Sequence, residues 1–213
     1  MKTTSDASQT AHEPWNKGKL IGQKPPLKLQ EIWTVRTQLR MAGNTRELAL
    51  FNLAIDSKLR GCDLVALRVR DIAHGNHVVA RASVVQHKTR EPVRFELTDQ
   101  TREAVQAWIK EAALSNGDYL FPSRQSGSPH LSARQYARIV KRWIGLMGAD
   151  PQEYGTHSLR RTKATLIYRQ TKNLRAVQLL LGHRKIDYVP QRTISRCRQS
   201  GWAGVPGCDS SGT

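Results

Sequence analysis

The chain has 213 residues, with 34 Lys and Arg against 17 Asp and Glu, so its formal net charge at pH 7 is +17. This length is enough for one domain with a sizeable core but short for two full domains with tails. A surface this positive attracts phosphate polyanions, which makes nucleic acid the expected partner. A protein that is merely basic stays an alternative, because net charge governs association and not fold.

The sequence disfavours several other classes. No stretch approaches the roughly 18 apolar residues of a membrane span, and residues 1–14 lack the apolar core of a secretory signal. Cys62, Cys197 and Cys208 are widely spaced and include no Cys-x-x-Cys pair, which argues against a disulfide framework and a zinc site. We therefore expect a cytoplasmic, nucleoid-associated protein with no membrane partner, no metal and no cofactor.

The first elements in chain order are an arm and two helices. Residues 1–27 are polar and basic with little apolar periodicity, which predicts a flexible N-terminal arm that either tracks a phosphate backbone or is plain solvated tail. Apolar residues at helical spacing predict a helix over 29–39. A second, buried helix begins at Asn44, where Glu47 completes a capping-box-like pair. We expect it to run to Arg60, with Gly61 ending it.

A hairpin and further helices follow. Residues 63–70 predict a short helix. The β-branched run 78–86 and the alternating run 92–97 predict a β-hairpin with Lys88 at its turn. Apolar spacing predicts further helices over residues 98–114, 136–147, 157–170 and 174–181. The fold is therefore predicted to be mainly α with a small antiparallel β-sheet.

The helical period is lost beyond Ile186, where Gly, Ser, Pro and Cys become frequent. Such a composition predicts a disordered, aberrant tail over 187–213. The expected organisation is then an arm over 1–27, a globular domain over 28–186 and this tail.

One short motif is typical of a phosphate-binding site. His157 and Arg160 lie three positions apart within a predicted helix, so that their side chains share one face. An imidazole and a guanidinium on one face can converge on a single small anion, and a phosphodiester is the obvious candidate.

This motif is one of four that stand in a known order. The others are Arg60 within Lys58-Leu59-Arg60-Gly61-Cys62-Asp63-Leu64, Lys88 in the hairpin, and Leu180-Leu181-Gly182-His183. Together the four motifs resemble the catalytic domain of the tyrosine recombinase (phage integrase) family over roughly residues 29–186. The resemblance implies the DNA breaking-rejoining fold, double-stranded DNA as the partner, and strand cleavage and rejoining by transesterification through a 3′-phosphotyrosine.

The resemblance also assigns roles to the motif residues. Arg60 and Arg160 would hold the non-bridging oxygens of the scissile phosphate through charge-assisted hydrogen bonds. Lys88 would protonate the departing 5′ oxygen, His157 would assist proton movement at the nucleophile, and His183 would hydrogen-bond the phosphate. Each residue also has a plainer interpretation: solvated arginines, a hairpin lysine that aids solubility, and histidines that cap or pack helices.

The nucleophile departs from the family pattern. The family's tyrosine usually falls about nine residues after the histidine of the Leu-Gly-His motif, and Arg192 occupies that position here. Tyr188 is the tyrosine downstream, but Val189-Pro190 follows at once and proline disrupts a helix that would present it. We hypothesise that the ancestral reading frame was lost near Asp187. The alternative function is then a catalytically impaired DNA-binding remnant or regulator without the nucleophile.

Further residues are expected to support the fold or to contact DNA. Asp63 matches an acidic position of the family motif and is expected to buttress the fold. The expected phosphate contacts are Arg161, Lys163, Arg134, Arg138 and Lys141. The few polar residues before the first helix predict that a separate DNA-clamping domain is missing. We expect a monomer in solution, and a synaptic oligomer on DNA as the family implies.

Two further functions remain open at this point. A general RNA- or DNA-binding protein would need none of the motif residues for its activity. A metal-dependent nuclease would need clustered carboxylates for two magnesium ions, and the sequence offers none that stand out.

Overall fold

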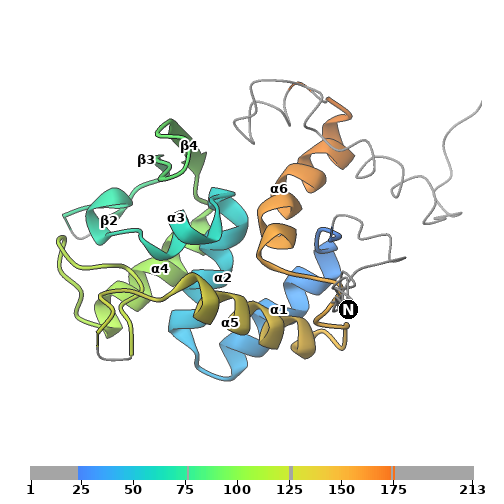
Figure 1. Ribbon diagram of the computed structural model, residues 1–213, viewed down its shortest axis with the longest axis horizontal. Helices are drawn as coiled ribbons and strands as arrows, with labels where there is room; N and C mark the ends of the chain where they lie inside the picture. The colour runs from blue at the N-terminus through green and yellow to red at the C-terminus, as the bar shows by residue number, and fades with distance from the viewer. Residues whose placement is uncertain (1–23, 76, 125–126, 174, 176–213) are drawn as a thin grey trace, which may run out of the picture.

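The computed structural model describes residues 24–75, 77–124, 127–173 and 175 (Figure 1). The helices are α1 (Leu29–Met41), α2 (Thr45–Ser57), α3 (Gly61–Val65), α4 (Asp99–Glu111), α5 (Ala133–Leu146) and α6 (Thr156–Thr171), with a 3₁₀ helix η1 at Val69–Asp71. The strands are β1 (Ala73–His74), β2 (His77–Val78), β3 (Arg81–Val85) and β4 (Pro92–Glu96). The predicted mainly helical fold with small antiparallel sheets is confirmed. Most of the arm, the predicted helix over 174–181 apart from Arg175, the tail, His183, Tyr188 and Arg192 lie outside the described residues.

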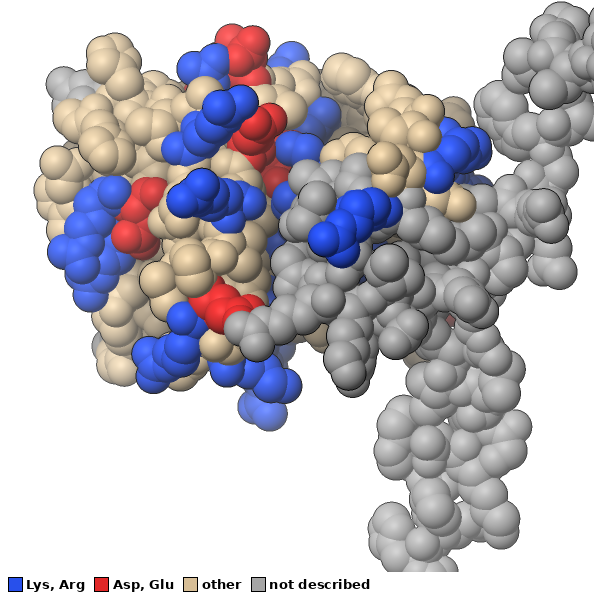
Figure 2. Space-filling model, turned by 90° about the horizontal axis from the view of Figure 1, so that it is seen from above, with Lys and Arg blue, Asp and Glu red and all other residues tan. Residues whose placement is uncertain are grey.

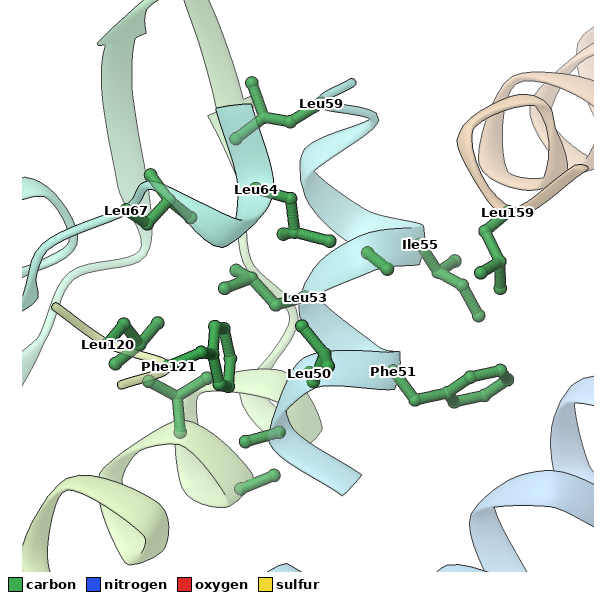
Figure 3. Packing of buried hydrophobic residues seen from close by; sticks show 14 of the residues in the cluster. Leu50, Phe51, Leu53, Ile55, Leu59, Leu64, Leu67, Leu120, Phe121 and Leu159 are labelled. Carbon is green, nitrogen blue, oxygen red and sulfur yellow. The ribbon is translucent and has the colours of Figure 1, made fainter. Parts of the chain in front are cut away.

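Helix α2 is the centre of the core. Asn44 caps it as predicted, because its side-chain oxygen accepts a hydrogen bond from the Glu47 backbone N–H at 3.2 Å. Its middle and last turns are buried on all sides, and α1, α4 and α6 pack around it. Figure 3 shows Ile55 of α2 beside Leu159 of α6, with Leu53 turned toward Phe121 on the other side. The chain that leaves the buried end of α2 continues through Lys58 and Arg60 into the site described below.

The end of α2 differs from the prediction. The helix stops at Ser57, and Lys58 follows in the left-handed conformation at φ 55°, so the prediction that Gly61 ends this helix was wrong. Gly61 instead begins α3, and Arg60 is the extended residue before it. A Cβ atom on Gly61 would lie 3.2 Å from Cδ1 of Tyr136, so the glycine allows α3 to approach α5 closely.

The helix predicted over 63–70 is divided in the structure. Helix α3 covers its first part and η1 its last, with Ala66, Leu67 and Arg68 between them. Leu67 is buried, and its carbonyl accepts a hydrogen bond from the Leu120 N–H at 2.8 Å. This pairing with a distant segment stops the helix from continuing through these residues, and no local pattern announces it.

The β3–β4 hairpin is confirmed, with Val84 opposite Val93 and Arg81 opposite Glu96. Its turn comprises residues 87–89 and therefore includes Lys88, as predicted. The β1–β2 pair was not predicted, because strands of two residues are too short to show alternation.

The remaining helices agree with the prediction to within a few residues. Helix α5 begins earlier than its apolar spacing indicates, because Ser132 caps it and accepts a hydrogen bond from the Gln135 N–H at 3.1 Å. Just before α1, Leu27 is only 2% exposed, and its N–H donates to Oγ1 of Thr162 in α6 at 3.0 Å. The last residues of the segment predicted as an arm are therefore packed on the domain.

The part of the chain that the structure describes lacks the features of two other classes of protein. No helix there is long and apolar enough to cross a membrane. No group of three or more His, Cys, Asp or Glu residues is arranged there to hold a metal ion.

Candidate functional site

Arg60 is fixed at the junction of α3 and the β3–β4 hairpin. As the extended residue that precedes α3, it is half-buried, and its guanidinium donates a hydrogen bond to Oε1 of Gln86. Gln86 is buried where β3 ends, and the same Oε1 also accepts from the Thr89 hydroxyl at 3.0 Å. The base of the hairpin turn therefore holds the Arg60 side chain in one orientation.

Asp63 ties the same turn to α3. It is 5% exposed, and its Oδ1 accepts a hydrogen bond from the His87 backbone N–H at 2.9 Å. This contact agrees with the buttressing role predicted for Asp63. Lys88 is the next residue along the turn and is exposed. The exposed ammonium of Lys88 thus extends from a turn whose root is anchored beside Arg60.

Helix α6 supplies the second arginine. Arg160 lies in its second turn and is half-buried, and its Nε has no hydrogen-bond partner among the described residues. Burial lowers the pKa of Arg160 below its ordinary value, the nearby Arg60 guanidinium lowers it further, and Asp63 opposes them. Arg60 and Arg160 are distant in sequence, and the effect of the Arg60 charge on the pKa of Arg160 indicates that the two side chains are neighbours in space.

His157 lies one turn before Arg160 on the same helix, as the sequence spacing predicts. Partial burial lowers the pKa of its imidazole, and the charges of Arg161, Arg160 and Arg60 lower it further. The ring is therefore neutral at pH 7 and can accept a proton. A neutral base beside two guanidinium groups is suited to bind an anion and to receive a proton from a group that attacks it.

A second charged cluster lies one turn further along α6. Lys163 donates from Nζ to Oδ1 of Asp56 at 2.9 Å, and the other carboxylate oxygen accepts from Thr98 and Thr101. Burial alone would raise the pKa of Asp56, but the Lys163 charge and these hydrogen bonds hold it below its ordinary value. Lys163, expected from the sequence as a DNA contact, is thus engaged in an ion pair inside the protein.

Lys58 also faces this region, and the sequence analysis did not single it out. It is 3% exposed, and burial together with the Lys163 charge lowers its pKa to about 8. The only signal in the sequence is its place two residues before Arg60. A lysine at this position is expected on the surface, but in the structure it is buried and its backbone is left-handed.

Four other basic residues were expected from the sequence as phosphate contacts. The Arg161 guanidinium donates to the Lys24 backbone carbonyl at the start of the described chain. Arg134, Arg138 and Lys141 are exposed along α5 at spacings that place them on neighbouring turns. Figure 2, which looks down on the hairpin end of Figure 1, shows Lys and Arg spread over this face with acidic side chains between them. The face is therefore positive overall but not uniformly so.

Known proteins resemble this chain in sequence. The model of the Phage integrase family matches residues 29–193. The probable integrase/recombinase YoeC of Bacillus subtilis (strain 168) is 29% identical over 160 residues, which cover 75% of this chain and 83% of YoeC. Tyrosine recombinase XerC of Psychromonas ingrahamii is 32% identical over 141 residues, which cover 65% of this chain and 45% of that protein.

Solved structures resemble it in fold. XerH site-specific recombinase bound to palindromic difH substrate, in a post-cleavage complex, superposes with a TM-score of 0.65 at 20% identity, over 84% of this chain and 51% of XerH. A lambda integrase dimer bound to a COC′ core site gives a TM-score of 0.60 at 20% identity, over 85% and 50%. The chain therefore spans about half the length of these structures.

Proposed function

Since the chain belongs to the phage integrase family, we propose that it binds double-stranded DNA and takes part in site-specific recombination by breaking and rejoining a strand. The observation that carries this proposal is the convergence of Arg60 and Arg160, each of which depends on a different part of the fold. Two half-buried neighbouring guanidinium groups repel each other, and a phosphate between them would attract both and offset that repulsion. The solved structures of XerH and lambda integrase bound to DNA support the choice of DNA.

In this proposal the two arginines bind the non-bridging oxygens of one phosphodiester. Negative charge grows on those oxygens as the phosphorus is attacked, and donors that are already in place stabilise it without reorganisation. The Gln86 and Asp63 contacts keep Arg60 and the hairpin turn fixed for this purpose.

The chemical step is a transesterification. A tyrosine hydroxyl oxygen forms a bond to phosphorus while the bond from phosphorus to the 5′ oxygen breaks, which leaves a 3′-phosphotyrosine. His157 takes up the phenolic proton as a neutral imidazole, and Lys88 gives a proton to the departing 5′ oxygen. Rejoining is the reverse attack by a 5′ hydroxyl, so the bond energy is conserved. His183 is proposed as a further phosphate ligand, and Tyr188 is the candidate nucleophile on this chain.

A second function is favoured by one observation, which is that Arg192 stands where the family's tyrosine is expected. Without a nucleophile the same arginines would still bind a phosphate. The chain would then be a DNA-binding remnant or regulator that occupies recombination sites without cutting them.

A nicked-substrate experiment separates the two functions. The full chain is incubated with nicked duplexes of randomised core sequence, and protein–DNA adducts that survive SDS are isolated and sequenced. Strand transfer predicts an adduct that Arg160→Ala abolishes, and loss of the adduct in Tyr188→Phe would identify the nucleophile. DNA binding without any adduct would support the remnant, and failure to bind DNA would refute both.

A further inference from the structure

Lys58 occupies an unusual place for a lysine. It connects α2 to α3 in the left-handed conformation at φ 55°, which residues other than glycine, asparagine and aspartate seldom adopt. Its side chain is 3% exposed, although lysine is among the residues least often buried. Both features disfavour lysine at this position, so its ammonium needs a compensating interaction.

No described residue provides a counter-ion that pairs with the Lys58 ammonium alone. Four charged groups face Lys58: Asp56 at the end of α2, Glu96 on β4, and Lys163 and Arg160 on α6. Both oxygens of Asp56 are occupied by Lys163, Thr98 and Thr101, and Glu96 pairs with Arg81 at 2.8 Å. No hydrogen bond from the Lys58 ammonium to another described residue is formed. The two cations that face it therefore outweigh acids that already have partners.

We propose that a DNA phosphate supplies the missing counter-ion, so that Lys58 is a third cation of the phosphate site beside Arg160 and DNA binding is coupled to protonation of this lysine. The inference rests on the proposed function, because it assumes that DNA occupies the site. It adds a residue to which the resemblance assigns no role, although Lys58 lies within the Arg60 motif, and it makes the affinity for DNA depend on pH.

The direction of the pH dependence follows from linkage. In the free protein burial and the neighbouring cations hold the pKa of Lys58 at about 8, so at neutral pH the amine is largely but not fully protonated. A nearby phosphate favours the ammonium and raises this pKa. Binding therefore takes up protons near pH 8 and weakens as the pH rises, by about tenfold for each unit by which DNA raises the pKa.

The test measures the affinity of the full chain for a short fluorescein-labelled duplex by anisotropy, at fixed salt, from about pH 7 to about pH 9.5. The wild type should lose about tenfold in affinity over this range if DNA raises the pKa by one unit. Lys58→Met should bind more weakly at pH 7 and show no such loss. Lys58→Arg, whose guanidinium stays charged, should retain its affinity at the upper end. Lys110→Met on α4 is the matched control and should keep the wild-type slope.

Several results would overturn the inference. A Lys58→Met variant with the wild-type pH slope, or with unchanged affinity at pH 7, would show that the ammonium does not act on DNA. Lys58→Gly serves as a second neutral variant, because glycine accepts the left-handed backbone and circular dichroism can verify its fold. Wild-type protein that binds no duplex would refute the proposed function itself, whereas binding with no dependence on Lys58 would refute only this inference.

Discussion

Two neighbouring charged clusters on α6 differ in whether their buried charges are paired. Lys163 meets Asp56, whose carboxylate is fully engaged by the lysine and by Thr98 and Thr101. One turn earlier, Arg160 lies near Arg60, another cation. The Nε atom of Arg160 has no hydrogen-bond partner among the described residues. Since an unpaired buried charge costs far more than a paired one, the first cluster is suited to holding the fold and the second to holding a ligand.

Contacts around the second cluster hold its two arginines together. The arginines repel each other, so other contacts must hold them in place. Gln86 and the hairpin turn fix Arg60, while the Asp56 pair and the packing of Leu159 fix α6. The compensated cluster thus helps to position the uncompensated one.

The largest expected effect comes from removing the central acid of the compensated cluster. Asp56→Ala should lower the free energy of unfolding by about 3 to 5 kcal/mol, because it leaves the largely buried Lys163 ammonium without its acid. Urea unfolding followed by circular dichroism measures it. Glu103→Ala, an exposed acid on α4, is the control and should change stability by less than about 0.5 kcal/mol. A loss below about 1 kcal/mol for Asp56→Ala would contradict the structural role.

The loss of folding stability at acid pH should depend on the same Asp56 carboxylate. Since the folded-state pKa of Asp56 lies below its ordinary value, its contribution is present above that value and is lost as the pH falls through the folded pKa. Asp56→Asn should therefore flatten the loss of stability between about pH 5 and about pH 2. An unchanged acid limb in this variant would assign the acid sensitivity to other groups.

Arg160→Ala should show the opposite behaviour, with a large effect on DNA and a small one on folding. Loss of a charge-assisted contact to phosphate should weaken binding by roughly 100-fold, measured by anisotropy at fixed salt. The free energy of unfolding should hold or rise, because the substitution relieves repulsion with Arg60. Lys163→Met gives the contrast on the same helix and should lower stability more than affinity. Equal effects of both substitutions on both measurements would erase the distinction between the clusters.

Lys58→Met should stabilise the free protein by about 1 to 3 kcal/mol at pH 7, because it removes a buried ammonium that lacks a counter-ion. The folded-state pKa of about 8 lies below the ordinary 10.5, so wild-type stability should rise as the pH increases between these values. The variant should lack this rise in urea titrations. Destabilisation at pH 7 would mean that the lysine is compensated within the protein.

The smallest effect is expected from the surface pair on the hairpin. Arg81 and Glu96 lie 2.8 Å apart, but their side chains are 82% and 66% exposed, so solvent screens their attraction. Arg81→Gln should change the free energy of unfolding by less than about 0.5 kcal/mol in a thermal melt. A loss as large as that of Asp56→Ala would show that exposure does not decide the worth of these pairs.

Much of this molecule could be predicted from local patterns. Helical spacing, the Asn44 cap, the β-branched run before Lys88 and the alternating run after it depend on residues that are near in sequence, and the structure confirms these elements. The motif order also indicated the family before any geometry was known. Patterns failed where a distant segment intervenes, as where Leu120 pairs with Leu67 and interrupts a predicted helix.

The sequence by itself determined the charge, the helical periods and the identity of the residues that can bind a phosphate. Only the tertiary structure decided which of the cations are already paired, because pairing depends on side chains that the fold brings together from α2, β4 and α6. From the sequence Lys163 is expected to be a free cation and Lys58 a surface residue, whereas in the structure Lys163 pairs with Asp56 and Lys58 is buried. The physical reason is that charge is a property of a residue, whereas compensation and burial are properties of its surroundings.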